Sequence, residues 1–171
     1  NYIHYQESGD VIMTKGLNVK EKKLKLDDLS YIDQEVSDLL PRSQLKEGDV
    51  VMTYIGINIG DEALVDGLNK YHLAPNVAKI SIKDQKQILP EFLVNQIYYS
   101  RGKFVRRAGN TAKAVLNMEK IRNIEIMIPE VSEQDSYIHL VRQSDKSKFE
   151  FYGGFKIMKN TKTCSKCGGN D

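Results

Sequence analysis

The densest group of cationic side chains in the sequence lies between residues 101 and 113, where no acidic residue interrupts it. The group flanks Gly109-Asn110-Thr111, a loop whose small residues would let it approach a duplex closely. Cationic side chains contact phosphates, while arginine and asparagine pair with the edges of guanine and adenine. The segment is therefore predicted to contact nucleic acid, and a solvated hairpin without a ligand is the alternative. The cationic residues are Arg101, Lys103, Arg106, Arg107 and Lys113.

A second group of polar and aromatic side chains is expected at turns and strand ends, where a sheet presents side chains to a partner. Each member also has a structural interpretation: Asn58 between two glycines suits a turn, and Tyr71 suits a core. We interpret the set as candidate base contacts. Its members are Tyr54, Asn58, Tyr71, His72 and Asn76.

Two cysteines near the end of the sequence are spaced like half of a zinc site. Cys164 and Cys167 supply a pair of sulfur ligands, whereas a closed structural zinc site needs four ligands. His4, His72 and His139 are each isolated in the sequence. Two copies of the chain could complete a site of four cysteines, but we expect an exposed tail and no metal. So few cysteines also exclude a disulfide framework and indicate a reducing compartment.

The motifs of DNA-modifying catalysis are missing from the sequence. A methyltransferase is expected to show a glycine-rich cofactor loop and an Asn/Asp-Pro-Pro-aromatic motif, and neither occurs. The Gly-x-x-x-x-Gly-Lys-Ser/Thr phosphate loop is missing as well. A metal-dependent nuclease needs clustered carboxylates, whereas Glu21-Lys22-Lys23 and Asp27-Asp28 are typical of charged surface turns. We predict a protein that is not an enzyme and that binds no cofactor.

Charge is distributed unevenly along the 171 residues. Residues 1–69 contain 7 Lys+Arg and 13 Asp+Glu, for a net charge of −6, and residues 70–171 contain 18 and 10, for a net charge of +8. Nucleic-acid-binding proteins often confine their basic surface to part of the molecule in this way. No apolar stretch is long enough to span a bilayer and no signal pattern opens the sequence, which indicates a cytoplasmic protein.

These side chains need a scaffold, and short apolar runs separated by turn residues predict strands in the first half of the sequence. We expect strands at 11–13, 49–55, 63–65 and 76–82. Glycines at positions 56 and 60 predict a turn between the second and third of these strands. The expected fold class is α+β, with a twisted, partly barrel-like sheet made of hairpins and a packed helix.

The packed helix and a closing strand are expected after residue 90. Pro90 suits the first turn of a helix with one apolar face, which we expect to run to residue 101 and to stop at Gly102. The alternation of apolar and polar residues at 124–128 predicts a strand that closes the sheet before Pro129.

A second helix is predicted at 132–152, with Ser132 as its N-cap and Gly153-Gly154 as its end. Its apolar stripe is sparse and Asp145 interrupts it, so the helix needs a partner for stability. The residues after it have no periodicity and are expected to form a flexible tail. The predicted organisation is a folded domain at 1–130, a helix at 131–152 and a tail at 153–171.

Five sequence motifs occur in an order that is hard to obtain by chance. The first two are Leu45 to Thr53 followed by Ile55-Gly56 and Ile59-Gly60, and the helix start Leu89-Pro90-Glu91-Phe92-Leu93. The later ones are Gly109-Asn110-Thr111, Leu116-Asn117, and the run Ile121 to Pro129 with Glu133-Gln134 after it. Over roughly residues 10–140, the sequence resembles one target-recognition domain of the specificity subunit of type I restriction-modification enzymes.

The resemblance implies a mixed α/β recognition domain and a spacer helix that packs against a matching helix. It implies sequence-specific recognition of one part of a split double-stranded DNA target. Methylation and cleavage would belong to partner methyltransferase and restriction subunits, which use S-adenosylmethionine and Mg. Two copies of the chain could form a homodimer through residues 132–152. The sequence departs from the family in having one recognition domain rather than two, in lacking an opening segment with Trp and a glycine-rich turn, and in its short spacer helix.

Two other interpretations stay open: a non-catalytic interaction or scaffold domain whose basic face binds an acidic partner, and a truncated remnant of a specificity subunit. An unrecognised nuclease is the least favoured. Within the DNA interpretation, Arg107 or Asn110 is the expected base reader, and Arg101, Lys103 and Lys113 are expected phosphate contacts. The full set of expected DNA contacts is Arg101, Lys103, Arg106, Arg107, Asn110, Thr111, Lys113, Tyr54, Asn58, Tyr71 and Asn76.

Overall fold

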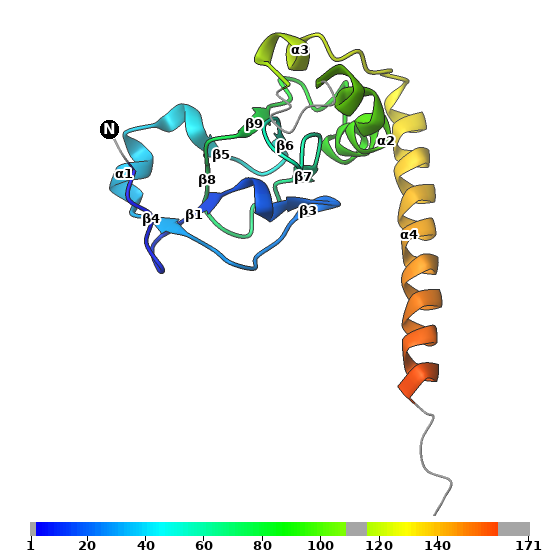
Figure 1. Cartoon of the computed structure of the whole chain (residues 1–171). Coiled ribbons are helices and arrows are strands. Elements are labelled where there is room, and N and C mark those ends of the chain that lie inside the picture. The colour runs from blue at the N-terminus through cyan, green and yellow to red at the C-terminus, as the bar shows by residue number, and fades with distance from the viewer. Residues whose placement is uncertain (1–2, 109–115, 161–171) are drawn as a thin grey trace, which may run out of the picture.

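The computed structural model describes residues 3–108 and 116–160. Short strands joined by turns and loops follow one another up to residue 80, and the longer helices come after them, so the expected α+β class is confirmed (Figure 1). The strands are β1 (Val11–Thr14), β2 (Val19–Lys20), β3 (Lys22–Leu24), β4 (Tyr31–Ile32), β5 (Gln44–Leu45), β6 (Val50–Thr53), β7 (Glu62–Leu64), β8 (Tyr71–Leu73) and β9 (Val77–Ile80). The helices are α1 (Gln34–Asp38), α2 (Pro90–Ala108), α3 (Met118–Arg122) and α4 (Val131–Asn160), with 3₁₀ turns η1 (Gly16–Asn18) and η2 (Pro41–Ser43).

The strands form two open sheets of mixed direction. One has the order β4-β1-β8-β5 and the other the order β2-β3-β7-β6-β9. Parallel pairs join β1 to β8 and β3 to β7, and the other pairs are antiparallel. The sheets do not close into a barrel.

The strand predicted to close the sheet does not form. Residues 124–128 belong to no strand, although Ile124 and Ile126 pack against the core and Met127 is exposed. An alternation of apolar and polar residues requires only that one side of an extended segment lie on an apolar surface. Here the apolar side chains pack on the core, and none of the described strands pairs with the segment.

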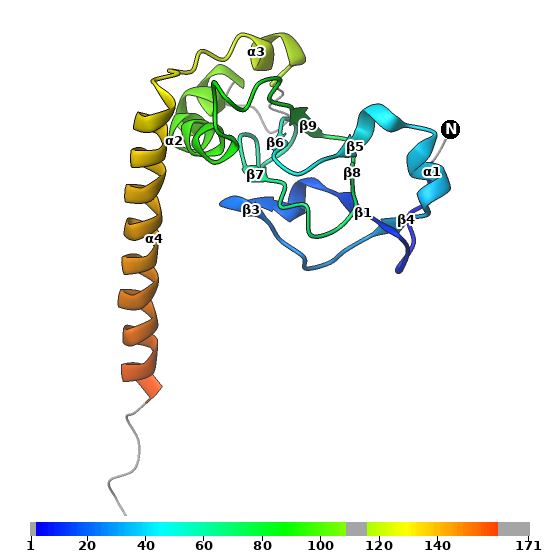
Figure 2. The ribbon, with the colours of Figure 1, turned by 180° about the vertical axis from the view of Figure 1, so that it is seen from behind.

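Strand β6 lies at the centre of the core. Val50 and Met52 point to one side, where they pack with Leu93 and Ile97 of α2. Val51 points to the other side and belongs to a second cluster, which links the two sheets. A strand that is buried on both faces needs consecutive apolar residues, which explains the run Val50-Val51-Met52 in β6. Helix α2 covers one face of the larger sheet (Figure 2).

Helix α2 is longer than the sequence predicts. It begins at Pro90 as expected but continues through Gly102 to Ala108. Glycine in a helix costs about 1 kcal/mol relative to alanine, and it ends a helix only when it adopts the left-handed conformation. Gly102 is not among the described glycines with positive φ. The basic residues that follow it therefore lie on a helix.

Helix α4 begins where predicted, within one residue, and also runs past its expected end. It continues through Gly153-Gly154 to Asn160, so the end predicted at residue 152 is wrong. Its first half packs on α2, where the rings of Phe92 and Tyr137 meet edge to face at 5.4 Å. Its second half projects away from the rest of the molecule (Figure 1). Within the described ranges, no helix is long and apolar enough to cross a membrane.

Candidate nucleic-acid interface

The basic residues after position 100 lie in the second half of α2. Lys103 and Arg106 are exposed there. Consecutive residues of an α-helix are rotated by about 100°. Arg106 and Arg107 both belong to α2, so their backbone positions are about 100° apart around the helix axis. The side chain of Arg107 and the predicted contacts Asn110, Thr111 and Lys113 fall outside the residues whose positions are described.

Arg101 fastens α2 to the loop between β6 and β7. Its Nη1 lies 2.5 Å from Oδ1 of Asp61, the last residue before β7. Gly60 has φ +81°, and a Cβ there would lie 3.0 Å from Cγ of Arg101, so any other residue would be strained and would press on the Arg101 side chain. Burial raises the pKa of the Asp61 carboxyl, and the Arg101 guanidinium opposes that shift. Arg101 is thus engaged within the protein.

A second carboxyl group is buried next to this ion pair. Glu62, the first residue of β7, is 1% exposed. Burial raises the pKa of the Glu62 carboxyl to about 8, with the neighbouring Asp61 adding to the increase. Near neutral pH the group is therefore mostly protonated, and it leaves the negative charge of Asp61 to pair with Arg101.

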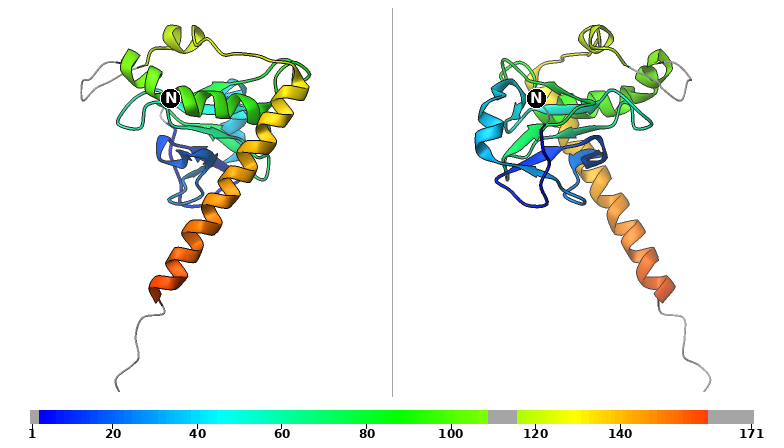
Figure 3. Two further views of the ribbon diagram at one scale, coloured as in Figure 1. Left: turned by 90° about the vertical axis from the view of Figure 1, so that its right-hand side faces the viewer. Right: turned by 60° about the vertical axis from the view of Figure 1, so that its left-hand side comes forward.

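Three of the predicted base contacts lie close to this ion pair. The Tyr54 backbone N–H donates to the carbonyl of Asn76 at 3.0 Å, and the Tyr54 carbonyl accepts from the N–H of Leu116 at 2.9 Å. Asn58 lies half-buried in the β6–β7 loop, and Asn76 is exposed in the turn between β8 and β9 with φ +73°. The carboxyl-terminal half of α2 lies at the same end of the molecule (Figure 3).

Two other candidates lie elsewhere and are buried. Tyr71 is 2% exposed, and its hydroxyl donates to Oδ1 of Asp66 at 3.0 Å and accepts from Asn69. His72 is also buried, with Nδ1 3.0 Å from Oγ of Ser37. Both belong to β8, which lies inside the smaller sheet. The ring of Tyr71 fills the core, so the side chain presents almost no surface to a partner.

One exposed residue of this region was missed in the sequence. Ile57, at the tip of the β6–β7 loop, is 94% exposed. Its place between Gly56 and Gly60 was the available signal, because paired glycines mark a tight turn whose tip faces solvent.

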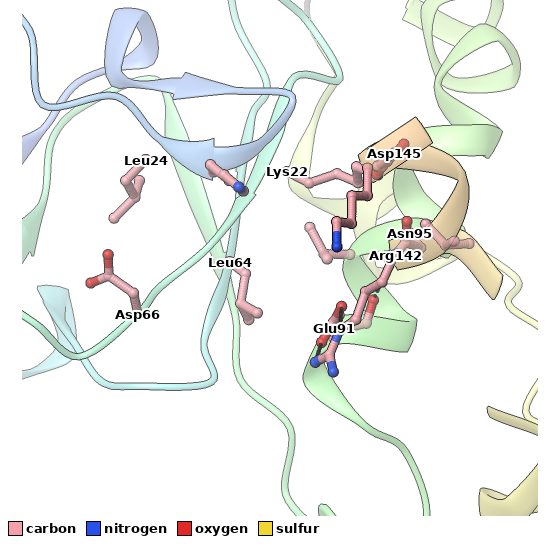
Figure 4. A pocket seen from close by; sticks show the side chains of 12 residues that line it. Lys22, Leu24, Leu64, Asp66, Glu91, Asn95, Arg142 and Asp145 are labelled. Carbon is pink, nitrogen blue, oxygen red and sulfur yellow. Dashed lines mark hydrogen bonds and ion pairs between the residues drawn. The ribbon is translucent and has the colours of Figure 1, made fainter. Parts of the chain in front are cut away.

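A groove of about 780 Å³ lies between β3, β7, α2 and α4 (Figure 4). Ion pairs of Lys22 with Asp145, at 2.6 Å, and of Arg142 with Glu91 tie α4 to the domain along it. The groove mixes both charge signs with apolar side chains such as Leu24 and Leu64. It therefore lacks the uniform positive charge expected of a surface that binds DNA.

No metal-binding group of His, Cys, Asp or Glu occurs among the residues that the structure places. Cys164 and Cys167 fall outside them.

A family model described as type I restriction modification DNA specificity domain matches residues 13–162. The chain belongs to this family. The sequence resemblance is thereby confirmed, as is the interpretation of the chain as a DNA-recognition domain that is not itself an enzyme. No curated protein matches the sequence of this specificity domain.

A solved structure shows the same fold. It is described as "Structural basis underlying complex assembly and conformational transition of the type I R-M system", and it superposes on the specificity domain with a TM-score of 0.66 at 12% sequence identity. The match covers 90% of this chain and 36% of that one. The specificity domain therefore spans about a third of the length of the chain it matches.

Proposed function

We propose that the specificity domain reads one part of a split double-stranded DNA target, as half of the specificity subunit of a type I restriction-modification system. The single observation that carries this proposal is the joining of the basic half of α2 to the β6–β7 loop through Arg101 and Asp61. A basic helix beside a tight loop offers cations for phosphates and side chains for base edges. The family to which the chain belongs supports the assignment.

Within this interface the roles divide between positioning and contact. Arg101 is held by Asp61, so it positions the β6–β7 loop. Lys103 and Arg106 are exposed on α2 and supply phosphate contacts. Tyr54, Asn58 and Asn76 stay candidate base contacts beside them. We keep Arg107, Asn110, Thr111 and Lys113 as proposed contacts on the strength of the sequence.

The partners follow from the same assignment. Methyltransferase and restriction subunits would carry out the chemistry, with S-adenosylmethionine and Mg bound by them. The cytoplasm is where such a complex would meet DNA. The proposed organisation is a recognition unit at 1–130, a spacer helix from 131, and a tail.

The specificity domain is further proposed to form a homodimer through α4. Only the first half of the helix packs on the domain, and the part from about residue 146 to Asn160 projects from it (Figure 1). Isolated helices shorter than roughly 12 to 15 residues are marginal in water. Pairing with a matching helix from a second copy or from a methyltransferase subunit would stabilise this part.

Selection from random duplex oligonucleotides tests DNA reading directly. The expected result is one short motif, bound with an affinity that falls as salt rises. Equal binding to all duplexes and to an acidic polymer such as heparin would support a scaffold with a basic face. Recovery of no motif at any salt concentration would contradict the proposal.

A further inference from the structure

Ile57 is the most exposed of the large apolar side chains that the structure describes, at 94% exposure. Ile59, two positions later in the same loop, is 4% exposed and belongs to the main core. Two isoleucines in one short turn thus differ in burial, since one is exposed and the other is in the core. The loop is anchored through Ile59 and leaves Ile57 in water.

The backbone of the loop holds Ile57 outward. The Gly60 N–H donates to the Thr53 carbonyl at 2.8 Å, and the Asp61 N–H donates to the Asn58 carbonyl at 3.0 Å. Gly56 has φ +101°, and a Cβ there would meet no atom within 4 Å, so the tip has open space around it. Isoleucine is also stiff about χ1 because it is β-branched. An exposed but ordered apolar side chain is ready to contact a partner at little entropic cost.

The position of the tip identifies the partner class. The loop is joined to α2 by the close approach of Gly60 to Arg101 and by the Arg101–Asp61 ion pair, three and four residues after Ile57. The exposed cations Lys103 and Arg106 follow on the same half of α2. The loop and the cationic end of α2 are thus neighbouring segments joined through Arg101, so a duplex whose phosphates contact this end of α2 would present a groove to the loop tip.

The only apolar group that base edges present in the major groove is the 5-methyl group of thymine. The major groove is about 12 Å wide and admits two chain segments, whereas the minor groove is about 6 Å wide. A turn between two strands therefore fits the major groove without deforming the DNA. We propose that Ile57 reads a thymine by contact with its 5-methyl group. This inference rests on the proposed function.

The test combines base analogues with variants of the whole chain. In the selected duplex, each thymine is replaced in turn by deoxyuridine, which removes only the methyl group. One replacement should weaken binding by the native protein about fourfold, the amount that burial of one methyl group supplies. Ile57→Ala should bind the thymine duplex about as weakly, and deoxyuridine at that position should then change nothing further.

Leu68→Ala is the matched control, because Leu68 is 79% exposed but follows the other end of β7. It should keep the full sensitivity to deoxyuridine. The inference is overturned if Ile57→Ala retains that sensitivity, or if the selected site contains no thymine. It is also overturned if Ile57→Ala reduces DNA bending while deoxyuridine has no effect, because Ile57 would then act as a wedge between bases. Binding without any sequence preference would instead remove the proposed function itself.

Discussion

Gln134 of α4 accepts a hydrogen bond from the backbone N–H of Leu89, with an N–O distance of 2.9 Å. Its amide nitrogen donates to the carbonyls of Gln87 and Pro129, each at 2.8 Å, and the side chain is fully buried. One amide group thus satisfies three backbone groups and joins the start of α4 to the start of α2.

Replacement of Gln134 by alanine is expected to destabilise the fold. It would leave three buried backbone groups without their partner, which predicts a loss of about 1–3 kcal/mol in the free energy of unfolding. Urea denaturation measures this change in the free energy of unfolding. Ser136→Ala, an exposed position on the same helix, should change the value by less than about 0.5 kcal/mol. Equal effects of the two variants would mean that Gln134 does not join the helices.

Asp61→Asn should loosen the β6–β7 loop and reduce sequence discrimination. The variant removes the charge that holds Arg101, so the ratio of affinities for preferred and scrambled duplexes should fall. The freed guanidinium gains access to phosphate, so the slope of log affinity against log salt should steepen by up to about one. Fluorescence anisotropy titrations at several salt concentrations give both quantities. An unchanged ratio would show that the ion pair does not position the reading surface.

Arg106→Ala should weaken binding to all duplexes equally. Loss of one phosphate contact is expected to lower the salt slope by about one. Lys86→Ala is a matched control, because Lys86 is also exposed but lies before the start of α2, whereas Arg106 lies near its end. The helix has 19 residues and is about 28 Å long, so the two cations are far apart. Identical slopes for the two variants would argue against a contact at Arg106.

Arg107→Ala should behave differently from Arg106→Ala, since we propose Arg107 as a base reader. The expected loss is about 1–3 kcal/mol on the preferred duplex, with relaxed choice at one base pair and little change on scrambled DNA. Competition binding with single-base variants of the site measures both the loss of affinity and the change in base preference. A uniform loss on all duplexes would instead make Arg107 a second phosphate contact.

The stability of the protein should fall as pH rises towards 8 because of Glu62. Its carboxyl has a pKa of about 8 in the folded state against an ordinary value of 4.5, so between these values the folded state binds the additional proton. The free energy of unfolding therefore decreases with pH in this range, on the order of 5 kcal/mol in total, and levels off above it. Glu62→Gln should remove this component. Urea denaturation of both proteins between pH 5 and about 9 compares them, and parallel curves would contradict the prediction.

Truncation after Lys146 should abolish dimerisation without unfolding the domain. The shortened chain keeps the contacts of Gln134, Tyr137, Arg142 and Asp145 with the domain and removes the projecting half of α4. Light scattering should give a dimer for the whole chain and a monomer for the truncated one, with the same unfolding midpoint at low concentration. A monomeric whole chain at high concentration would exclude pairing through α4.

Elements with long or well-marked patterns could be predicted from the amino-acid sequence alone. The apolar run of β6, Pro90 at the start of α2 and the N-terminal signals of α4 each reflect local physics, because burial and capping act within a few residues. The cationic group after residue 100 and the order of the motifs also belong to the sequence. The order of the motifs led to the correct family.

The remaining features could not be predicted, because they depend on contacts between residues far apart in the chain. Strands such as β2 and β4 have two residues each, too few for any periodicity, and exist through their neighbours. Arg101 forms an ion pair with Asp61, forty positions earlier, so its guanidinium binds the β6–β7 loop within the protein. Ile57 and Ile59 are the same residue two positions apart. Only the packing of the loop against α2 and β6 determines that one enters the core while the other faces outward.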